Sequence, residues 1–288
     1  MTENAAAKME RVDFRGMDVW YRRAGAGKPL LFLHNGGNSH IIWQRQLQHF
    51  AASHECFAFD LPGYGKSVNL SMRYSLQFYV DFLREFMTQM GIEKVTLVGN
   101  CVGSAISLSH AIEQPESVER LILFNILTKA TVWDGILGPF FKLTAPVPFM
   151  RPLLKSTFGG IRSPAVVSRY SVAKQYGNKS VRDPRLDAEL CALYRQKGQV
   201  GALADILVDI NSFDRLDRFR MPEGFPPTIV LWGEDNHVLP CPAGRRLVGM
   251  LRPRRFEVIA GAGHLVMHES AEAVNTLIDV FLAEEPAP

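Results

Sequence analysis

The stretch Gly99-Asn100-Cys101-Val102-Gly103 has residue types and a spacing suited to nucleophilic catalysis. A nucleophile between two glycines is typical of the sharp strand-to-helix turn that exposes a catalytic side chain at the end of a sheet. We expect the helix N-terminus after Cys101 to favour the thiolate and lower the thiol pKa. The backbone N–H of Val102 would then be one oxyanion donor. The alternative interpretation is that Cys101 is a small buried apolar residue, as most free cysteines are.

A second candidate group is the imidazole of His264, which follows Gly261-Ala262-Gly263. These glycines let the chain approach a nucleophile closely. A histidine late in the chain also fits the order nucleophile, acid, histidine, in which it acts first as a base and then as an acid. The alternative interpretation is a solvated surface histidine.

These side chains need a sheet to position them, and the chain shows alternating strand and helix patterns. Strand patterns lie at 12–22, 29–34, 55–60, 94–98, 120–126, 227–232 and 255–259, and helical patterns lie at 40–52, 75–90, 102–111 and 270–284. This alternation predicts an α/β fold with a doubly wound, mostly parallel sheet. The proline-broken segment between the strands predicts an inserted helical lid. We expect a core of residues 1–126 and 225–288 and a cap domain at 127–224.

Composition and charge limit the classes of partner. The chain has 288 residues, of which 47% are hydrophobic and 21% charged, as is typical of a globular protein. Its net charge is +3, yet residues 126–200 hold 12 Lys and Arg against 4 Asp and Glu. A basic insertion predicts an anionic partner such as an acyl carrier protein, coenzyme A or a membrane surface. The alternative is a solvated helical face.

The cysteines Cys56, Cys101, Cys191 and Cys241 show neither paired nor metal-binding spacing. The start of the chain has no signal-like apolar core, and no apolar run reaches roughly 18 residues. These features predict a cytoplasmic protein with free thiols and no transmembrane segment. The sequence has no phosphate-binding glycine loop, so we expect no cofactor and no metal. Aromatic residues are too sparse among the basic ones to predict nucleic-acid binding.

Four spaced motifs together resemble the α/β-hydrolase fold superfamily, in a variant with a cysteine nucleophile. They are Asp60-x-x-Gly63-x-Gly65-x-Ser67, Gly99-x-Cys101-x-Gly103, Trp232-Gly233 followed by Pro240, and Gly261-x-Gly263-His264. The match covers nearly the whole chain outside the lid. The resemblance implies a catalytic triad of nucleophile, acid and histidine.

The resemblance leaves the acid of this triad open. The usual acid position, three residues after Gly233, holds Asn236, and Asp235 stands one residue earlier. A second position that some members use corresponds to Asn125, again an amide. Because a thiol ionises more easily than a hydroxyl, an amide that orients the imidazole can suffice in a Cys-His-Asn site. We therefore expect Asn236, or Asp235 after a one-residue loop shift, to orient His264, with Asn125 as the third candidate. The alternative is that Asn236 and Asp235 only shape a turn.

The loop that begins at Asn35 supplies the remaining candidates. The resemblance implies a second oxyanion donor in this loop, which we place at the backbone N–H of Gly36, with Asn35 or Gly37 as neighbours. The alternative is that these glycines only form a tight turn. Asn35, Asn38 and Asn125 are candidates for substrate contact, and His40 is a weaker one.

A cysteine nucleophile limits the substrates. A thiolate attacks thioesters, activated esters and lactones readily, whereas the alkoxide of a plain alkyl ester leaves less easily than the thiolate that attacked. Apolar lid residues from Ile136 to Leu154 predict a hydrophobic acyl part. We therefore predict an acyl-enzyme-forming hydrolase or acyltransferase, similar to a thioesterase, esterase or lactonase. The rival hypothesis is a non-hydrolytic ligand-binding or scaffold protein on the same fold.

Overall fold

The structure is a computed structural model, and it describes residues 7–144, 162–177 and 182–284. The described residues form one eight-stranded sheet in the order β1-β2-β4-β3-β5-β6-β7-β8. Its strands are β1 (Lys8–Phe14), β2 (Met17–Ala24), β3 (Lys28–Leu33), β4 (His54–Phe59), β5 (Val95–Asn100), β6 (Val118–Phe124), β7 (Thr228–Gly233) and β8 (Arg255–Ile259). The pairs β1–β2 and β2–β4 are antiparallel, whereas the pairs that link β4, β3, β5, β6, β7 and β8 are parallel. The predicted α/β fold with a mostly parallel sheet is confirmed.

The central strands are buried along almost their whole length. Every residue of β5 and β7 is buried, and in β6 only Glu119 is partly exposed. Continuous apolar strands of this kind need helices on both faces of the sheet. Since parallel strands end at the same edge, the residues that follow β5, β6, β7 and β8 come together there.

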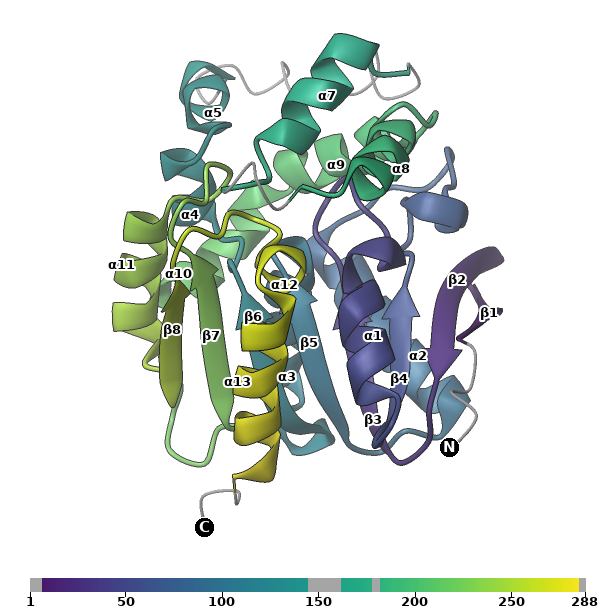
Figure 1. Ribbon diagram of the computed structural model, residues 1–288, viewed down its shortest axis with the longest axis vertical. Helices are drawn as coiled ribbons and strands as arrows, with labels where there is room; N and C mark the ends of the chain where they lie inside the picture. Colours follow the sequence, from purple (N-terminus) through teal and green to yellow (C-terminus); the bar gives the residue numbers. More distant parts are fainter. Residues whose placement is uncertain (1–6, 145–161, 178–181, 285–288) are drawn as a thin grey trace.

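Helices cover both faces of the sheet, over two separate apolar clusters (Figure 1). One cluster includes side chains of α2 (Leu76–Met90), α3 (Val102–Glu113), α10 (Asp214–Arg218) and α11 (Cys241–Leu251). The other includes side chains of α1 (Gln44–Phe50), α12 (Val266–Glu269) and α13 (Ala271–Ala283). Short 3-10 turns are η1 (His40–Trp43), η2 (Gly65–Ser67), η3 (Pro115–Ser117) and η5 (Ile210–Phe213). The doubly wound arrangement predicted from the sequence is therefore confirmed.

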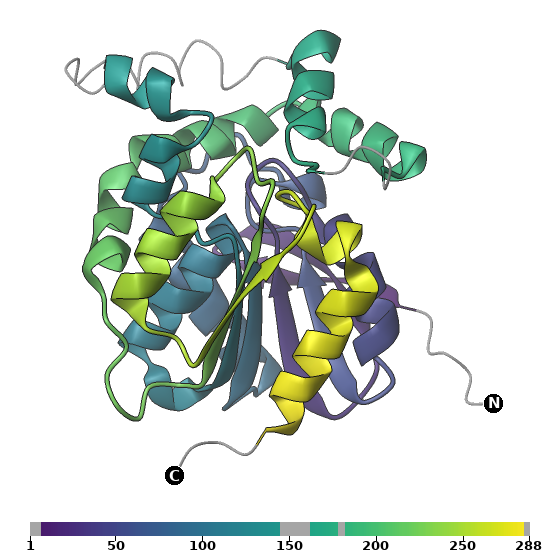
Figure 2. The same cartoon turned by 60° about the vertical axis from the view of Figure 1, so that its left-hand side comes forward.

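The segment between β6 and β7 adds helices at the carboxyl edge of the sheet (Figures 1 and 2). Besides α10, its described helices are α4 (Lys129–Asp134), α5 (Gly138–Thr144), α7 (Ala165–Ala173), α8 (Pro184–Tyr194) and α9 (Gln199–Val208). The predicted apolar lid residues at 147–154 lie outside the described residues. The division into a core and a cap at 127–224 stays a prediction. Along the described ranges, no helix is long and apolar enough to cross a membrane.

Candidate active site

Cys101 occupies the sharp turn between β5 and α3. Its backbone has φ +55° and ψ −107°, a conformation that residues other than glycine rarely adopt. A Cβ on Gly99 would lie 2.4 Å from the carbonyl carbon of Gly103, and one on Gly103 would lie 2.1 Å from the Leu33 carbonyl oxygen. Both glycines are therefore needed for the strand and the helix to approach each other, as the sequence predicts.

The thiol of Cys101 is buried and protonated at neutral pH. Burial raises its pKa to about 12, although hydrogen bonds from the backbone N–H groups of Val102 and Gly36 act in the opposite direction. The predicted thiolate at a helix N-terminus is therefore wrong, because loss of solvation outweighs the two donors. The structure does bring both predicted oxyanion donors to the sulfur, but their role in catalysis stays a prediction.

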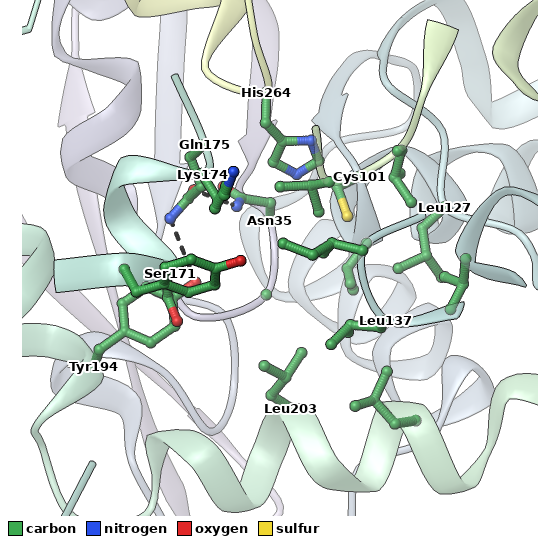
Figure 3. Close-up of a pocket in the computed structure, with 18 residues that line it drawn as sticks. Asn35, Cys101, Leu127, Leu137, Ser171, Lys174, Gln175, Tyr194, Leu203 and His264 are labelled. Atoms are coloured by element: carbon green, nitrogen blue, oxygen red, sulfur yellow. Dashed lines mark hydrogen bonds between the residues drawn. The ribbon is translucent and has the colours of Figure 1, made fainter. Parts of the chain in front are cut away.

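A cavity of about 360 Å³ opens in front of Cys101 and His264 (Figure 3). Apolar side chains form one part of its wall, namely Leu127, Val132, Ile136, Leu137 and Leu203. Polar side chains of the inserted segment form another part, namely Tyr170, Ser171, Lys174, Gln175 and Tyr194. A mostly apolar pocket with a few polar groups at one side is typical of a small-molecule site.

His264 lies on the loop after β8, and the inserted segment binds this loop directly. The backbone N–H groups of His264 and Leu265 donate to the Gln175 carbonyl oxygen at 2.7 and 3.2 Å. A Cβ on Gly263 would lie 2.2 Å from the Gly177 nitrogen, so the close approach requires a glycine. Burial lowers the pKa of His264 to about 3, so the imidazole is neutral at pH 7. Among the described side chains, no hydrogen bond joins the Cys101 sulfur to His264.

The side chain beside His264 Nδ1 is the amide of Asn236, at 3.1 Å from its Nδ2. The same Nδ2 donates to Asn125 Oδ1 at 2.9 Å. The Asn236 Oδ1 accepts from the backbone N–H groups of Val238 and Leu239 at 2.9 and 3.0 Å. The structure therefore brings together His264 and the residue at the position where the resemblance expects the acid.

Asp235, the alternative orienting residue, is not the group beside His264 Nδ1. It is exposed, and its backbone N–H donates to the Ala262 carbonyl oxygen at 2.9 Å. Within the described part of the chain, no hydrogen bond joins it to His264. An amide, and not a carboxylate, therefore lies beside the imidazole.

Asn125, predicted to contact substrate, lies beneath the site and outside the described cavity lining. Its Nδ2 donates to Asn100 Oδ1 at 3.0 Å and to the His264 carbonyl oxygen at 3.2 Å, and its Oδ1 accepts from the Gly233 N–H at 3.2 Å. The prediction of substrate contact is wrong, because protein groups occupy both ends of this amide. Its position holds Asn236 and the His264 loop in place.

Two of the other predicted loop residues differ in their access to the cavity. Asn35 lines it and donates to Gln175 Oε1 at 3.1 Å. Asn38 is fully buried outside the described lining, and its Nδ2 donates to Asn35 Oδ1 at 2.7 Å and to Gln175 Oε1 at 2.9 Å. The predicted substrate contact of Asn38 is therefore wrong in this structure.

Sequence reasoning missed the polar side chains of the inserted segment, above all Gln175. This residue contacts the Asn35 loop through its side chain and the His264 loop through its carbonyl group. No motif marks Gln175, Lys174 or Tyr194: the first two follow α7 and the third ends α8, and no local pattern determines how these helices lie against the sheet. Only the three-dimensional arrangement identifies them.

The fold and this site define an α/β hydrolase fold protein. The sequence profile of the family described as "alpha/beta hydrolase fold" matches residues 28–271, and the chain belongs to this family.

Curated relatives share 25–28% of their residues with the chain. One is a 2-hydroxy-6-oxononadienedioate/2-hydroxy-6-oxononatrienedioate hydrolase of Paraburkholderia phymatum, which is 28% identical over 299 residues. The match spans 98% of this chain and 98% of that protein. Another is an uncharacterized protein of Mycobacterium tuberculosis, 25% identical over 281 residues that span 93% of this chain and 79% of that protein. Relatives named as hydrolases support hydrolase activity.

Solved structures show the same fold at lower identity. An alpha/beta hydrolase fold protein from Burkholderia ambifaria matches with a TM-score of 0.77 and 21% identity, over 94% of this chain and 98% of that chain. A thermophilic esterase from Thermogutta terrifontis matches with a TM-score of 0.76 and 18% identity, over 96% and 98%.

Proposed function

We propose that the protein is an acyl-enzyme-forming hydrolase or acyltransferase in which Cys101 is the nucleophile. One observation carries this proposal. The Cys101 sulfur lies against two backbone N–H groups, those of Val102 and Gly36, at one end of a largely apolar cavity. In this proposal His264 is the imidazole of the catalytic site, and Asn236 orients it.

The chemistry follows from where a carbonyl group would bind. When the sulfur attacks an acyl carbon, the carbonyl oxygen acquires negative charge, and the two N–H groups at Cys101 can stabilise it. The apolar wall around Leu127 and Leu137 would hold a hydrophobic acyl chain. We propose an acyl thioester, an activated ester or a lactone as the substrate. The first two have leaving groups that depart readily from a thiol adduct, and a strained lactone gains from the opening of its ring.

The test is intact-protein mass spectrometry after brief exposure to a panel of acyl thioesters, activated esters and lactones. The panel includes coenzyme A and pantetheine thioesters, which also tests the predicted docking of an anionic carrier on the basic segment. We expect the wild type to gain the mass of one acyl group and the Cys101→Ala variant to gain none. The matched control is Cys191→Ala, because Cys191 is a half-buried thiol outside the cavity lining. An equal mass gain in Cys101→Ala contradicts the proposal.

A second candidate function is non-covalent binding of a hydrophobic acyl compound without turnover. The observation that favours it is the neutral pair, since burial keeps both the Cys101 thiol and the His264 imidazole uncharged at pH 7. A binding protein would take up acyl compounds with the same affinity in the wild type and in Cys101→Ala, measured by calorimetry. It would give no covalent adduct with any member of the panel.

A further inference from the structure

We infer that Asn236 holds His264 as the neutral tautomer with its proton on Nε2, so that the imidazole is a hydrogen-bond donor toward the cavity and not a base. Asn236 is thus a positioning residue whose effect is opposite to that of a triad carboxylate. The inference rests on the proposed function only for the class of acyl donor that it selects.

Backbone contacts determine which end of the Asn236 amide faces His264. The other end of this amide receives two backbone N–H groups, those of Val238 and Leu239. Two N–H donors can be satisfied only by an oxygen, because an amide nitrogen accepts no hydrogen bond. The end that faces His264 Nδ1 at 3.1 Å is therefore the NH₂ group.

A second set of contacts fixes the same orientation independently. Asn125 Oδ1 accepts from the Gly233 N–H at 3.2 Å, while Asn125 Nδ2 donates to the His264 carbonyl oxygen at 3.2 Å. The Asn125 amide is thus also oriented by backbone groups. Its Oδ1 lies 2.9 Å from Asn236 Nδ2, so a reversed Asn236 would bring two carbonyl oxygens into contact.

The orientation of the Asn236 amide determines the tautomer of the His264 imidazole. An Asn236 N–H that points at Nδ1 requires a lone pair on Nδ1, so the proton of the neutral ring is on Nε2. A second proton on Nδ1 would face the Asn236 NH₂ group and would be repelled by it. Nε2 has no partner among the described residues, and His264 lines the cavity.

One described carboxylate, that of Glu269, lies at the His264 loop, where its oxygens accept from the backbone N–H groups of Gly263 and Gly177 at 2.8 and 2.9 Å. The titratable groups in the cavity wall are Lys174, Tyr170 and Tyr194, and Tyr64 lies beside Cys101. Burial raises the pKa of Tyr64 well above its usual value, so that hydroxyl is neutral at pH 7. No described carboxylate forms a hydrogen bond to the His264 ring that would stabilise an imidazolium, and burial lowers the pKa of the ring.

An imidazole that only donates a hydrogen bond limits which acyl compounds can react with Cys101. With a thioester, a bond forms between the Cys101 sulfur and the acyl carbon, the bond from that carbon to the donor sulfur breaks, and the thiol proton passes from Cys101 to the leaving sulfur. His264 remains neutral throughout and only donates a hydrogen bond. An alkyl oxyester needs an imidazolium to protonate its leaving alkoxide, and Asn236 disfavours that ion. We therefore assign thioesters, and not alkyl oxyesters, as the acyl donors.

The test is the pH dependence of iodoacetamide alkylation at Cys101, followed by peptide mass spectrometry. The wild-type rate should rise only as the thiol itself ionises in the alkaline range. In Asn236→Asp a carboxylate stabilises the imidazolium, so a plateau should appear near neutral pH, with alkylation at pH 7 faster by about tenfold or more. The matched control is Asn211→Asp, the same change at an exposed residue outside the cavity lining, which should leave the profile unchanged.

Each outcome decides the inference separately from the proposed function. A neutral plateau in the wild type, or a folded Asn236→Asp with the wild-type profile, overturns the inference. If thermal unfolding shows that Asn236→Asp does not fold, Asn236→Ala replaces it, because loss of the donor frees Nδ1 and should also raise the rate at pH 7.

Iodoacetamide needs no acyl site, so the expected profiles without any acyl adduct would overturn the proposed function alone. Equal acylation of the wild type by a thioester and its matched alkyl oxyester would overturn the assigned donor class.

Discussion

Two buried histidines of this protein have opposite partners at the same ring nitrogen. At His264 the neighbour of Nδ1 is the NH₂ group of Asn236, at 3.1 Å. At His40 it is the carboxylate of Asp60, at 2.5 Å, and the Arg22 Nε–H donates to His40 Nε2 at 3.2 Å. The proton of His40 is therefore on Nδ1, whereas that of His264 is on Nε2. The group at Nδ1 decides which nitrogen of a buried imidazole donates.

The comparison also shows where this protein places one of its buried carboxylates, that of Asp60. Asp60 follows β4, and burial acts to raise its pKa. Hydrogen bonds from the His40 side chain and from the backbone N–H groups of Lys66 and His40 outweigh burial and hold that pKa below its usual value. His40 lines a second cavity of about 420 Å³ with Arg22, away from Cys101. The predicted substrate contact of His40 in the Cys101 cavity is therefore wrong. The carboxylate–imidazole pair and the thiol occupy different sites.

Removing the carboxylate at His40 should have the largest effect on stability. Asp60 accepts from the His40 backbone N–H at 3.0 Å, the His40 ring at 2.5 Å and the Lys66 N–H at 2.8 Å. In Asp60→Asn one of these buried donors faces an NH₂ group. We expect the free energy of unfolding to fall by about 3 kcal/mol, measured by urea denaturation.

The matched control for this change is Asp279→Asn. Asp279 also pairs with a histidine, His49, at 2.7 Å, but both side chains are about half exposed. The control should change the free energy of unfolding by less than about 0.5 kcal/mol. Equal losses in the two variants would contradict the structural role given to Asp60.

Acid should destabilise the protein through His264. Its folded pKa of about 3 lies below the ordinary value of 6.5, so between these values the unfolded chain binds one more proton at this residue. As the pH is lowered through this range, the free energy of unfolding should therefore decrease by about 1.4 kcal/mol per pH unit on account of His264 alone. In His264→Gln the slope measured by urea denaturation between about pH 6 and pH 4.5 should be shallower by that amount. His34 and His110 also have a lowered pKa of about 4 but remain in the variant, so an unchanged slope would contradict the neutral buried state of His264.

The smallest effect should come from the donor on the other side of His40. Arg22→Met removes the Nε–H that reaches His40 Nε2, and we expect the free energy of unfolding to fall by about 1 kcal/mol. In a His40→Leu background the same change should cost almost nothing, because the acceptor is already absent. Equal losses in both backgrounds would show that Arg22 does not act through His40.

The parts of the site that steric necessity fixes could be predicted from the sequence. The continuous apolar runs of β5, β6 and β7 predict buried parallel strands, and Gly99 and Gly103 predict the turn at Cys101, because a Cβ at either would collide with the backbone. Glycines before His264 likewise predict a loop that comes close to another segment. In each case a local residue type has a single physical explanation.

Other features depend on contacts that no local pattern contains. The choice of Asn236 over Asp235 and the direction of the Asn236 amide follow from the backbone N–H groups of Val238 and Leu239. The neutral thiol at Cys101 follows from the burial that the surrounding residues impose, which outweighs the helix N-terminus considered in the sequence. A charge state is therefore harder to predict from the sequence than a backbone turn.

The most direct test of this account is a nitrogen-15 NMR spectrum of the wild-type protein, labelled at histidine and recorded at pH 7. His264→Gln and His40→Gln variants assign the two residues. We predict a hydrogen bonded to Nε2 and not to Nδ1 in His264, and the reverse in His40. A hydrogen on Nδ1 of His264, alone or with one on Nε2, would contradict the account.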